Sequence, residues 1–427
     1  MQQRAILFVI ALAVSLPMPA LADFTPIAGW DRQLFPSYLI GTATIKTGDE
    51  EAEANVLGDP NGLLGISIVA PEQDTEIEVI IECNEFAEPS RFVGRLENEG
   101  ETYILFPKMK YRFDRLSQCS QATPASVSYR VVIGGNEVEE KSTNVTFRSI
   151  NDCPLKVVLG ETVIDTSFTF ASYVNEQHPF IDKLLREALD IGVVKNFVGY
   201  QAKKEEQVLL QVYAIWDLLV ARDVRYSSIT KTAADSEIIS SQNVRLLEDT
   251  INNQQANCVD GSVLLVSILR KIDIDAKLIF VPGHCFIGFY LDPENTKFVA
   301  LETTLLGAEV ATPNEVHEDL DNAIDESVRG EYSWPSFVAA IAAGNRILAE
   351  SETKEGGNRI VDISAARRIG VLPIPHRNQE VFVKFDHTSD DSDDDEGSDM
   401  ESESPSDDES IESGDVEDAS DEEEQDE

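Results

Sequence analysis

The stretch NCVDGSVLLVSILRKIDIDAKLIFVPGHCFIGFYLDPENTKFVALETT, residues 257–304, decides the fold of the second half of the chain. Its apolar residues first recur with helical spacing, from Cys258 to Ile272. Extended apolar runs follow at 276–281, 285–291 and 297–303, separated by a Pro-Gly turn and an Asp-Pro-Glu-Asn turn. A helix followed by an antiparallel meander predicts an α+β fold for this region.

Three residues of this stretch carry the side chains that a thiol enzyme needs. Such an enzyme combines a thiolate with a base that keeps it ionised and a group that orients the base. Cys258 begins the predicted helix, whose N-terminal partial positive charge lowers a thiol pKa. His284 starts one predicted strand, and Glu302 lies on the next, which in a sheet is about 5 Å away. We therefore predict Cys258, His284 and Glu302 as nucleophile, base and orienting acid.

Each assignment has a rival. Cys285 adjoins His284 in a strand, where successive side chains point to opposite faces, so it is a poor alternative nucleophile. Asp292 is the alternative acid, although its Asp-Pro context is typical of a turn. The plain structural interpretations are a buried helix-cap thiol for Cys258, a strand-edge residue for His284 and an exposed carboxylate for Glu302.

Residues of about 205–307 resemble a bacterial transglutaminase-like domain. The resemblance rests on motifs that occur in the family's order: Trp216, Arg225-Tyr226, Cys258-Val259-Asp260 with Leu269-Arg270, Gly283-His284, and Leu301-Glu302-Thr303. It covers about a quarter of the chain and implies a papain-like α+β domain that transfers or hydrolyses acyl groups of peptide or protein amides. The family's acid is usually Asp, and here it is Glu302. The oxyanion donors expected are the backbone N–H of Cys258 with Gln255 or Tyr226.

The region before this domain, residues 23–155, is predicted to be a β-sandwich. Turn clusters rich in Gly, Asn and Asp separate short runs of Ile, Val, Tyr and Phe, at 65–70, 76–82, 102–106 and 126–133. Three of the five cysteines lie here, and a Cys83–Cys153 disulfide is the first choice among the pairings with Cys119.

Helical spacing governs much of the second region, residues 165–385. One helix starts near Phe180 and ends at Gly192, a second covers 208–220, and a third covers 334–350. Residues 356–385 are expected to mix short extended pieces with loops. His178 precedes the first helix and is expected to be a surface or capping residue.

The two ends of the chain indicate export and a disordered tail. Residues 1–22 have the pattern of a signal peptide: Arg4, an apolar run and Ala20-Leu21-Ala22. Residues 386–427 hold 23 of the 78 acidic residues and no Lys or Arg, which predicts a disordered acidic tail. The formal net charge of −44 disfavours nucleic acid and anionic membranes as partners. The tail could instead attract a cationic partner.

We therefore expect an exported, periplasmic or extracellular thiol enzyme that acts on peptide or protein amides without a metal or cofactor. The alternative is a non-catalytic binding protein that uses a transglutaminase-like scaffold. A cation-buffering role of the tail is a third possibility, although the tail lacks the ligand spacing of a calcium loop. The sequence does not distinguish hydrolysis from cross-linking.

Overall fold

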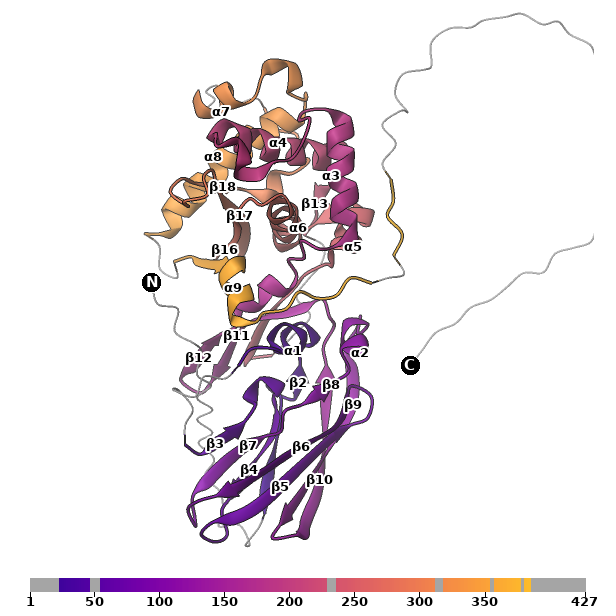
Figure 1. Cartoon of the computed structure of the whole chain (residues 1–427), viewed down its shortest axis with the longest axis vertical. Coiled ribbons are helices and arrows are strands. Elements are labelled where there is room, and N and C mark those ends of the chain that lie inside the picture. Colours follow the sequence, from indigo (N-terminus) through magenta and orange to yellow (C-terminus); the bar gives the residue numbers. More distant parts are fainter. Residues whose placement is uncertain are drawn as a thin grey trace, which may run out of the picture. The chain divides into compact units, whose positions relative to one another are not determined.

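The computed structural model describes residues 23–46, 54–228, 236–311, 318–353, 357–377 and 380–384. Within these ranges the chain is a mixed α+β protein, with sheets in both halves and most of the helices in the second half (Figure 1). The predicted signal peptide at 1–22 and the predicted acidic tail at 386–427 lie outside the described residues.

The first half contains two sheets. The four-stranded sheet has the order β1 (Phe24–Ala28), β4 (Leu64–Val69), β7 (Thr102–Phe106), β3 (Val56–Gly58). The six-stranded sheet has the order β2 (Gln33–Leu34), β10 (Asn136–Phe147), β9 (Thr123–Ile133), β5 (Thr75–Cys83), β6 (Ala87–Leu96), β8 (Lys110–Tyr111). The short helices α1 (Pro36–Thr42) and α2 (Phe113–Ser117) and the 3₁₀ turn η1 (Pro60–Gly62) complete this half.

Alternation of apolar and polar residues explains these strands. In β5 the side chains of Ile77, Val79 and Ile81 are buried, whereas Glu76 on the other face is exposed. The four apolar runs noted in the sequence coincide with β4, β5, β7 and β9, so these strand predictions are confirmed.

A three-stranded sheet follows, with the order β12 (Thr162–Asp165), β11 (Asp152–Leu159), β14 (Ile239–Asn243). Its central strand β11 comes directly after the six-stranded sheet, and β14 lies about 80 residues later, just before α5. The 3₁₀ turns η2 (Ser167–Ser172) and η3 (Gly199–Ala202) lie in the connections between them. Contacts group the described residues up to Val383 into one compact unit; of the second unit, which begins at Lys384, only Lys384 is described.

The helices of the second half begin and end close to where their sequence signals lie. They are α3 (Pro179–Ile191), α4 (Glu205–Ala221), α5 (Leu247–Asn253), α6 (Cys258–Lys271), α7 (Glu318–Ala323), α8 (Ser333–Ser351) and α9 (Ile363–Ile369). His178 caps α3 by accepting a hydrogen bond from the backbone N–H of Phe180, and Gly192 ends it in the left-handed conformation, at φ 94°. The predicted helices correspond to α3, α4, α6 and α8, whereas α9 lies in the stretch expected to hold loops and extended pieces.

The sheet that carries the predicted catalytic residues has the order β18 (Phe298–Leu301), β17 (His284–Tyr290), β16 (Ala276–Val281), β19 (Arg359–Asp362). Helix α6 packs against β16 and β17, and α8 packs against β18. This second packing is close, because a Cβ atom at Gly344 of α8 would lie 2.7 Å from the backbone of Ala300 and Leu301. A two-stranded parallel sheet, β13 (Arg225–Tyr226) with β15 (Gln255–Ala256), and the turns η4 (Thr303–Leu305) and η5 (Glu326–Val328) complete the fold.

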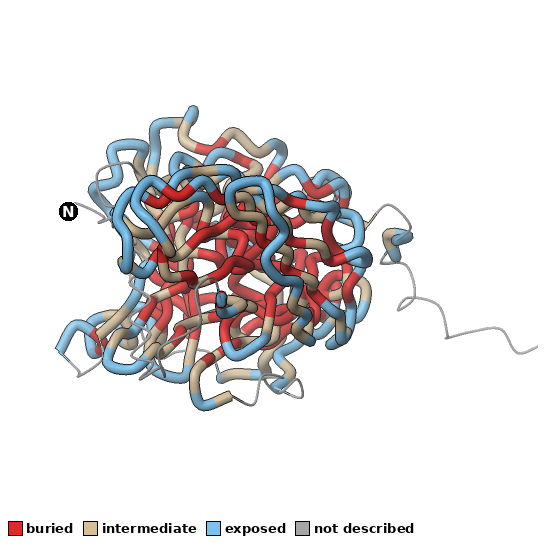
Figure 2. The backbone as a smooth tube through the Cα atoms, turned by 90° about the horizontal axis from the view of Figure 1, so that it is seen from below, coloured by how far each residue is buried: buried red, intermediate tan, exposed pale blue. Residues whose placement is uncertain are grey.

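Buried residues run through the interior of the molecule, and exposed residues lie at its periphery (Figure 2). Helix α6 lies deep in the fold: all 11 of its residues from Val259 to Leu269 are buried. Among the described residues, none of the helices has both the length and the apolar character to span a membrane.

The predicted Cys83–Cys153 disulfide is wrong, because all five cysteines are free thiols. Cys83 ends β5, whereas Cys153 lies in β11 with its Sγ 3.4 Å from the hydroxyl of Thr169. Cys119 instead contacts the carbonyl of Arg148. The three thiols are buried and make separate contacts, so burial rather than pairing accounts for them.

Candidate active site

Cys258 is the first residue of α6, and the preceding residue caps this helix. Asn257 has extended backbone angles, and its side-chain oxygen accepts hydrogen bonds from the backbone N–H groups of Val259 and Asp260, at 2.8 and 2.9 Å. As the first helical N–H, that of Cys258 has no intrahelical carbonyl to bind. The cap therefore fixes the start of the helix while the N–H of Cys258 stays outside the intrahelical pattern.

Asp260 completes the cap from the other side. Its carboxylate accepts a 2.9 Å hydrogen bond from the backbone N–H of Asn257, which makes a reciprocal capping box. The same carboxylate accepts hydrogen bonds from the backbone N–H and the guanidinium of Arg245, each at 2.7 Å. Arg245 was not among the residues predicted from the sequence, whereas the Asn-x-x-Asp spacing at 257–260 is a signal for the capping box.

His284 and Glu302 form a short hydrogen bond. His284 Nε2 lies 2.6 Å from Glu302 Oε2, and the Glu302 side chain is buried whereas that of His284 is 26 % exposed. The pairing of β17 with β18, in which Ile287 lies opposite Leu301, brings them together, and on its other side β17 pairs with β16, with His284 opposite Val281. The other carboxylate oxygen, Oε1, accepts from the backbone N–H and the hydroxyl of Thr304, at 2.9 and 2.6 Å. Both carboxylate oxygens of Glu302 are thus held in place.

These contacts set the charge states of the pair. Burial alone would raise the pKa of Glu302, but hydrogen bonds from His284 and Thr304 outweigh burial and lower it. Because an ionised carboxylate only accepts, Nε2 of His284 carries the proton and donates. Hydrogen bonding to Cys258, and then to Glu302, raises the pKa of His284 to about 9. The imidazole is therefore charged near neutral pH.

His284 thus lies between the thiol and the carboxylate. Since Glu302 occupies Nε2, Nδ1 is the ring nitrogen left for Cys258. The carbonyl of Cys258 is also held: it accepts from the hydroxyls of Ser262 and Thr303, at 2.6 and 3.2 Å. The structure brings together all three residues predicted from the sequence, and we call Cys258, His284 and Glu302 the triad.

The two rivals occupy other places. Cys285 is fully buried, and burial raises its pKa well above the usual value, so its thiol is unsuited to nucleophilic attack. Asp292 is half-buried and accepts hydrogen bonds from Thr296 and from the backbone N–H of Lys297. Asp292 is therefore a turn former, as its Asp-Pro context indicated.

The predicted oxyanion donors lie on the paired strands that lead to Cys258. In the β13–β15 sheet Arg225 pairs with Gln255 and Tyr226 with Ala256. Gln255 and Tyr226 are exposed, and neither side chain has a hydrogen-bond partner among the described residues. Both stay predictions. Gln255 lies three residues before Cys258 in the chain, and Tyr226 lies across the sheet from Ala256, two residues before Cys258.

A second buried charged cluster supports the segment before Cys258. Glu248 of α5 accepts a 3.1 Å hydrogen bond from His178 and a 2.9 Å hydrogen bond from Arg377. Arg377 also binds Asp249, at 2.6 Å. His178 is therefore buried and paired as well as a helix cap, which nothing in its local sequence indicated. The cluster anchors the segment 371–377 against α5. Helix α5 ends at Asn253, five residues before Cys258.

Among the described residues, no group of three or more His, Cys, Asp or Glu side chains could hold a metal ion. The acids, thiols and imidazoles of the site are used in hydrogen bonds to one another. Searches against protein-family models and against curated proteins give no match for this chain.

Proposed function

We propose that this chain is a transglutaminase-like thiol enzyme that transfers or hydrolyses the acyl group of peptide or protein amides. The observation that carries the proposal is the 2.6 Å hydrogen bond between Glu302 and a His284 that also interacts with Cys258. A charged imidazole between a thiol and a buried carboxylate is the arrangement that a thiol nucleophile needs.

In the proposed reaction the sulfur of Cys258 attacks the amide carbonyl. The C–N bond breaks, His284 gives its Nδ1 proton to the departing amine, and a thioester forms on Cys258. A water or a second amine then attacks the thioester, and its proton passes to His284 as the sulfur leaves. Glu302 keeps the imidazole oriented throughout and remains ionised.

The finer architecture belongs to the same proposal. We infer that the two N-terminal sheets form a β-sandwich and that residues 165–385 adopt a papain-like, transglutaminase-like fold. A capped helix that begins at the nucleophile and packs on an antiparallel sheet carrying the base supports this inference. We also propose export to the periplasm or the extracellular space, and a cationic partner for the tail at 386–427.

The test measures the fate of the thioester. Full-length protein is incubated with dimethylated casein, with and without dansylcadaverine, and Cys258→Ala protein serves as the control. Incorporation of dansylcadaverine assigns acyl transfer, and release of ammonia or new termini without incorporation assigns hydrolysis. If neither product and no acyl adduct on Cys258 forms with this casein or with a mixed peptide library, the chain is a binding protein on a related scaffold.

A further inference from the structure

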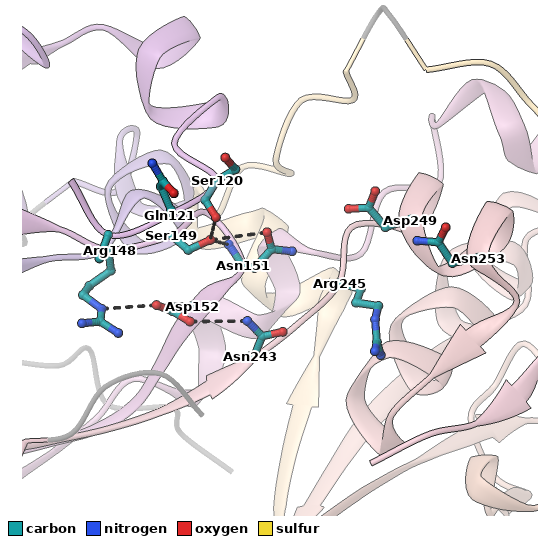
Figure 3. Close-up of a pocket in the computed structure, with 11 residues that line it drawn as sticks. Ser120, Gln121, Arg148, Ser149, Asn151, Asp152, Asn243, Arg245, Asp249 and Asn253 are labelled. Atoms are coloured by element: carbon teal, nitrogen blue, oxygen red, sulfur yellow. Dashed lines mark hydrogen bonds and ion pairs between the residues drawn. The ribbon is translucent and has the colours of Figure 1, made fainter. Parts of the chain in front are cut away.

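A polar cleft of about 420 Å³ lies away from the triad, between the β-rich first half and helix α5 (Figure 3). One wall comes from the turns at 120–122 and 148–152 together with Asn243 at the end of β14, and the other comes from Arg245 and from α5. No triad residue lines it. Figure 3 shows Arg148, Asp152 and Asn243 on one side and Arg245, Asp249 and Asn253 on the other.

Hydrogen bonds hold the two walls in a fixed arrangement. The side-chain N–H of Asn151 donates to the carbonyl of Val244, and the backbone N–H of Val244 donates to the carbonyl of Asn151, at 2.8 and 2.7 Å. Ser149 donates to the carbonyl of Ser120, at 2.9 Å. A ligand would therefore meet a preformed surface and would not have to order it.

The carboxylate at the base of the cleft is already satisfied. Asp152 is 1 % exposed, and its two oxygens accept from Arg148 Nε at 3.2 Å and from Asn243 at 3.5 Å. Asp249 on the other wall binds Arg377 through one oxygen, which leaves the second as an acceptor. Neither acid presents a bare negative charge to the cleft.

The unused groups are mainly donors. Among the described residues, nothing binds the terminal nitrogens of Arg148 or the Nη2 of Arg245, whose Nη1 binds Asp260. The side-chain amides of Gln121 and Asn253 are also unpaired within the described ranges. Guanidinium nitrogens arranged in a planar fork match a carboxylate, and amides and the free oxygen of Asp249 match peptide N–H and C=O groups.

We propose that this cleft is a binding site for a peptide segment that carries an acidic side chain. The terminal nitrogens of Arg148 bind the carboxylate, and Gln121, Arg245, Asn253 and Asp249 bind the peptide backbone. The site is separate from the triad and requires no catalysis, so binding can be tested whether or not the chain is an enzyme.

The experiment compares three end-blocked peptides, Gly-Ser-Glu-Ser-Gly and its Gln and Lys analogues, by titration calorimetry of the full chain at low salt. The Glu peptide should bind at least about tenfold more tightly than the Gln peptide, because hydrogen bonds to charged groups are the stronger ones. Its affinity should fall when the ionic strength rises, and the Lys peptide should bind more weakly than either.

Variants then place the binding in the cleft. Asn253→Asp adds a negative charge to the wall and should weaken binding of the Glu peptide about tenfold, whereas Asn136→Asp, the same change at an exposed strand end, should leave it within about twofold. Arg148→Lys keeps a charge beside Asp152 but loses the planar fork, and should weaken binding several-fold. Melting temperatures confirm that each variant folds. Equal affinity for the Glu and Gln peptides, no measurable binding of the Glu peptide, or unchanged binding by Asn253→Asp overturns the proposal.

Discussion

The carboxylate of Asp260 accepts hydrogen bonds from both the backbone and the guanidinium of Arg245, each at 2.7 Å. Asp260 lies two residues after Cys258 and also accepts from the backbone of Asn257. A residue outside α6 is thereby tied to the first turn of the helix. The position of the thiol depends on this buried ion pair as well as on the helix itself.

We predict that Asp260→Asn lowers the free energy of unfolding by about 2 kcal/mol, because it weakens charge-assisted hydrogen bonds and half of the capping box. The rate of Cys258 alkylation should fall as well, even at temperatures where the variant is fully folded. Asp182→Asn is the matched control, since Asp182 is an exposed first-turn acid of α3. Denaturant titration and labelling kinetics measure the two effects. Unchanged labelling by folded Asp260→Asn protein would show that the pair stabilises the helix without positioning the sulfur.

Cys258 should be the most reactive thiol in the chain. It is half-buried beside a charged imidazole, whereas burial raises the pKa values of Cys83, Cys119, Cys153 and Cys285. Iodoacetamide at about pH 6, followed by mass spectrometry of the peptides, should find the label first on Cys258. Cys285→Ala should leave this labelling unchanged. Labelling of Cys285 at an equal or higher rate would remove Cys258 as the nucleophile.

The charge on His284 should give activity an alkaline limit. Its pKa is raised to about 9, so the proton that it donates to the departing amine is lost as the pH rises through about 9. The same sign holds for stability: the contribution of the charged imidazole is complete below its unfolded value of about 6.5 and is lost by about pH 9. A profile of kcat/KM against pH, with thermal melting at each pH, measures both.

Glu302→Gln should preserve the fold and lower kcat by roughly one to four decades, because the imidazole loses its orienting carboxylate. The alkaline limit should also move to lower pH, since Glu302 helps to raise the pKa of His284. Asp292→Asn is the control and should change neither quantity, because within the described ranges Asp292 binds only its own turn. Full activity of Glu302→Gln together with an inactive Asp292→Asn would show that Asp292, and not Glu302, orients His284.

Acid should unfold the protein partly through Glu248. Burial alone would raise the pKa of Glu248, but hydrogen bonds from His178 and Arg377 outweigh it and lower the pKa to about 2. Its contribution to stability is therefore present above its unfolded value of about 4.5 and is lost as the pH falls towards 2. Glu248→Gln should destabilise the protein at pH 7 by about 3 kcal/mol and flatten the acid limb of the stability curve. Denaturant titrations at several pH values measure this; parallel acid limbs for both proteins would count against it.

Local sequence was enough to predict the elements that carry the triad. The helix that begins at Cys258 and the hairpin that carries His284 follow from the change of apolar period from helical to extended. The turn role of Asp292 followed from the proline after it. The register of β17 with β18 did not follow, because the Asp-Pro-Glu-Asn turn between them permits more than one pairing. This register places Glu302 near His284, where the two side chains lie 2.6 Å apart.

What the sequence did not reveal depends on contacts between distant segments. Glu248 and Arg377 are 129 residues apart, and no local pattern predicts that they meet. The pairing of β11 with β14 is equally non-local, and so is the cleft beside it. The disulfide prediction failed for a related reason: spacing along the chain does not tell whether two buried thiols share one side of a sheet.

Because α8 packs closely on β18, the site is also sensitive to substitution of Gly344, a residue that carries no reactive group. Any side chain at Gly344 would press on the backbone of Ala300 and Leu301, one residue before Glu302. The backbone N–H of Glu302 donates to the carbonyl of Ala340, also in α8, at 3.0 Å. A shift of α8 would therefore also shift Glu302. In a saturation screen for loss of function, position 344 should therefore group with the triad, and replacement by alanine should already be selected against.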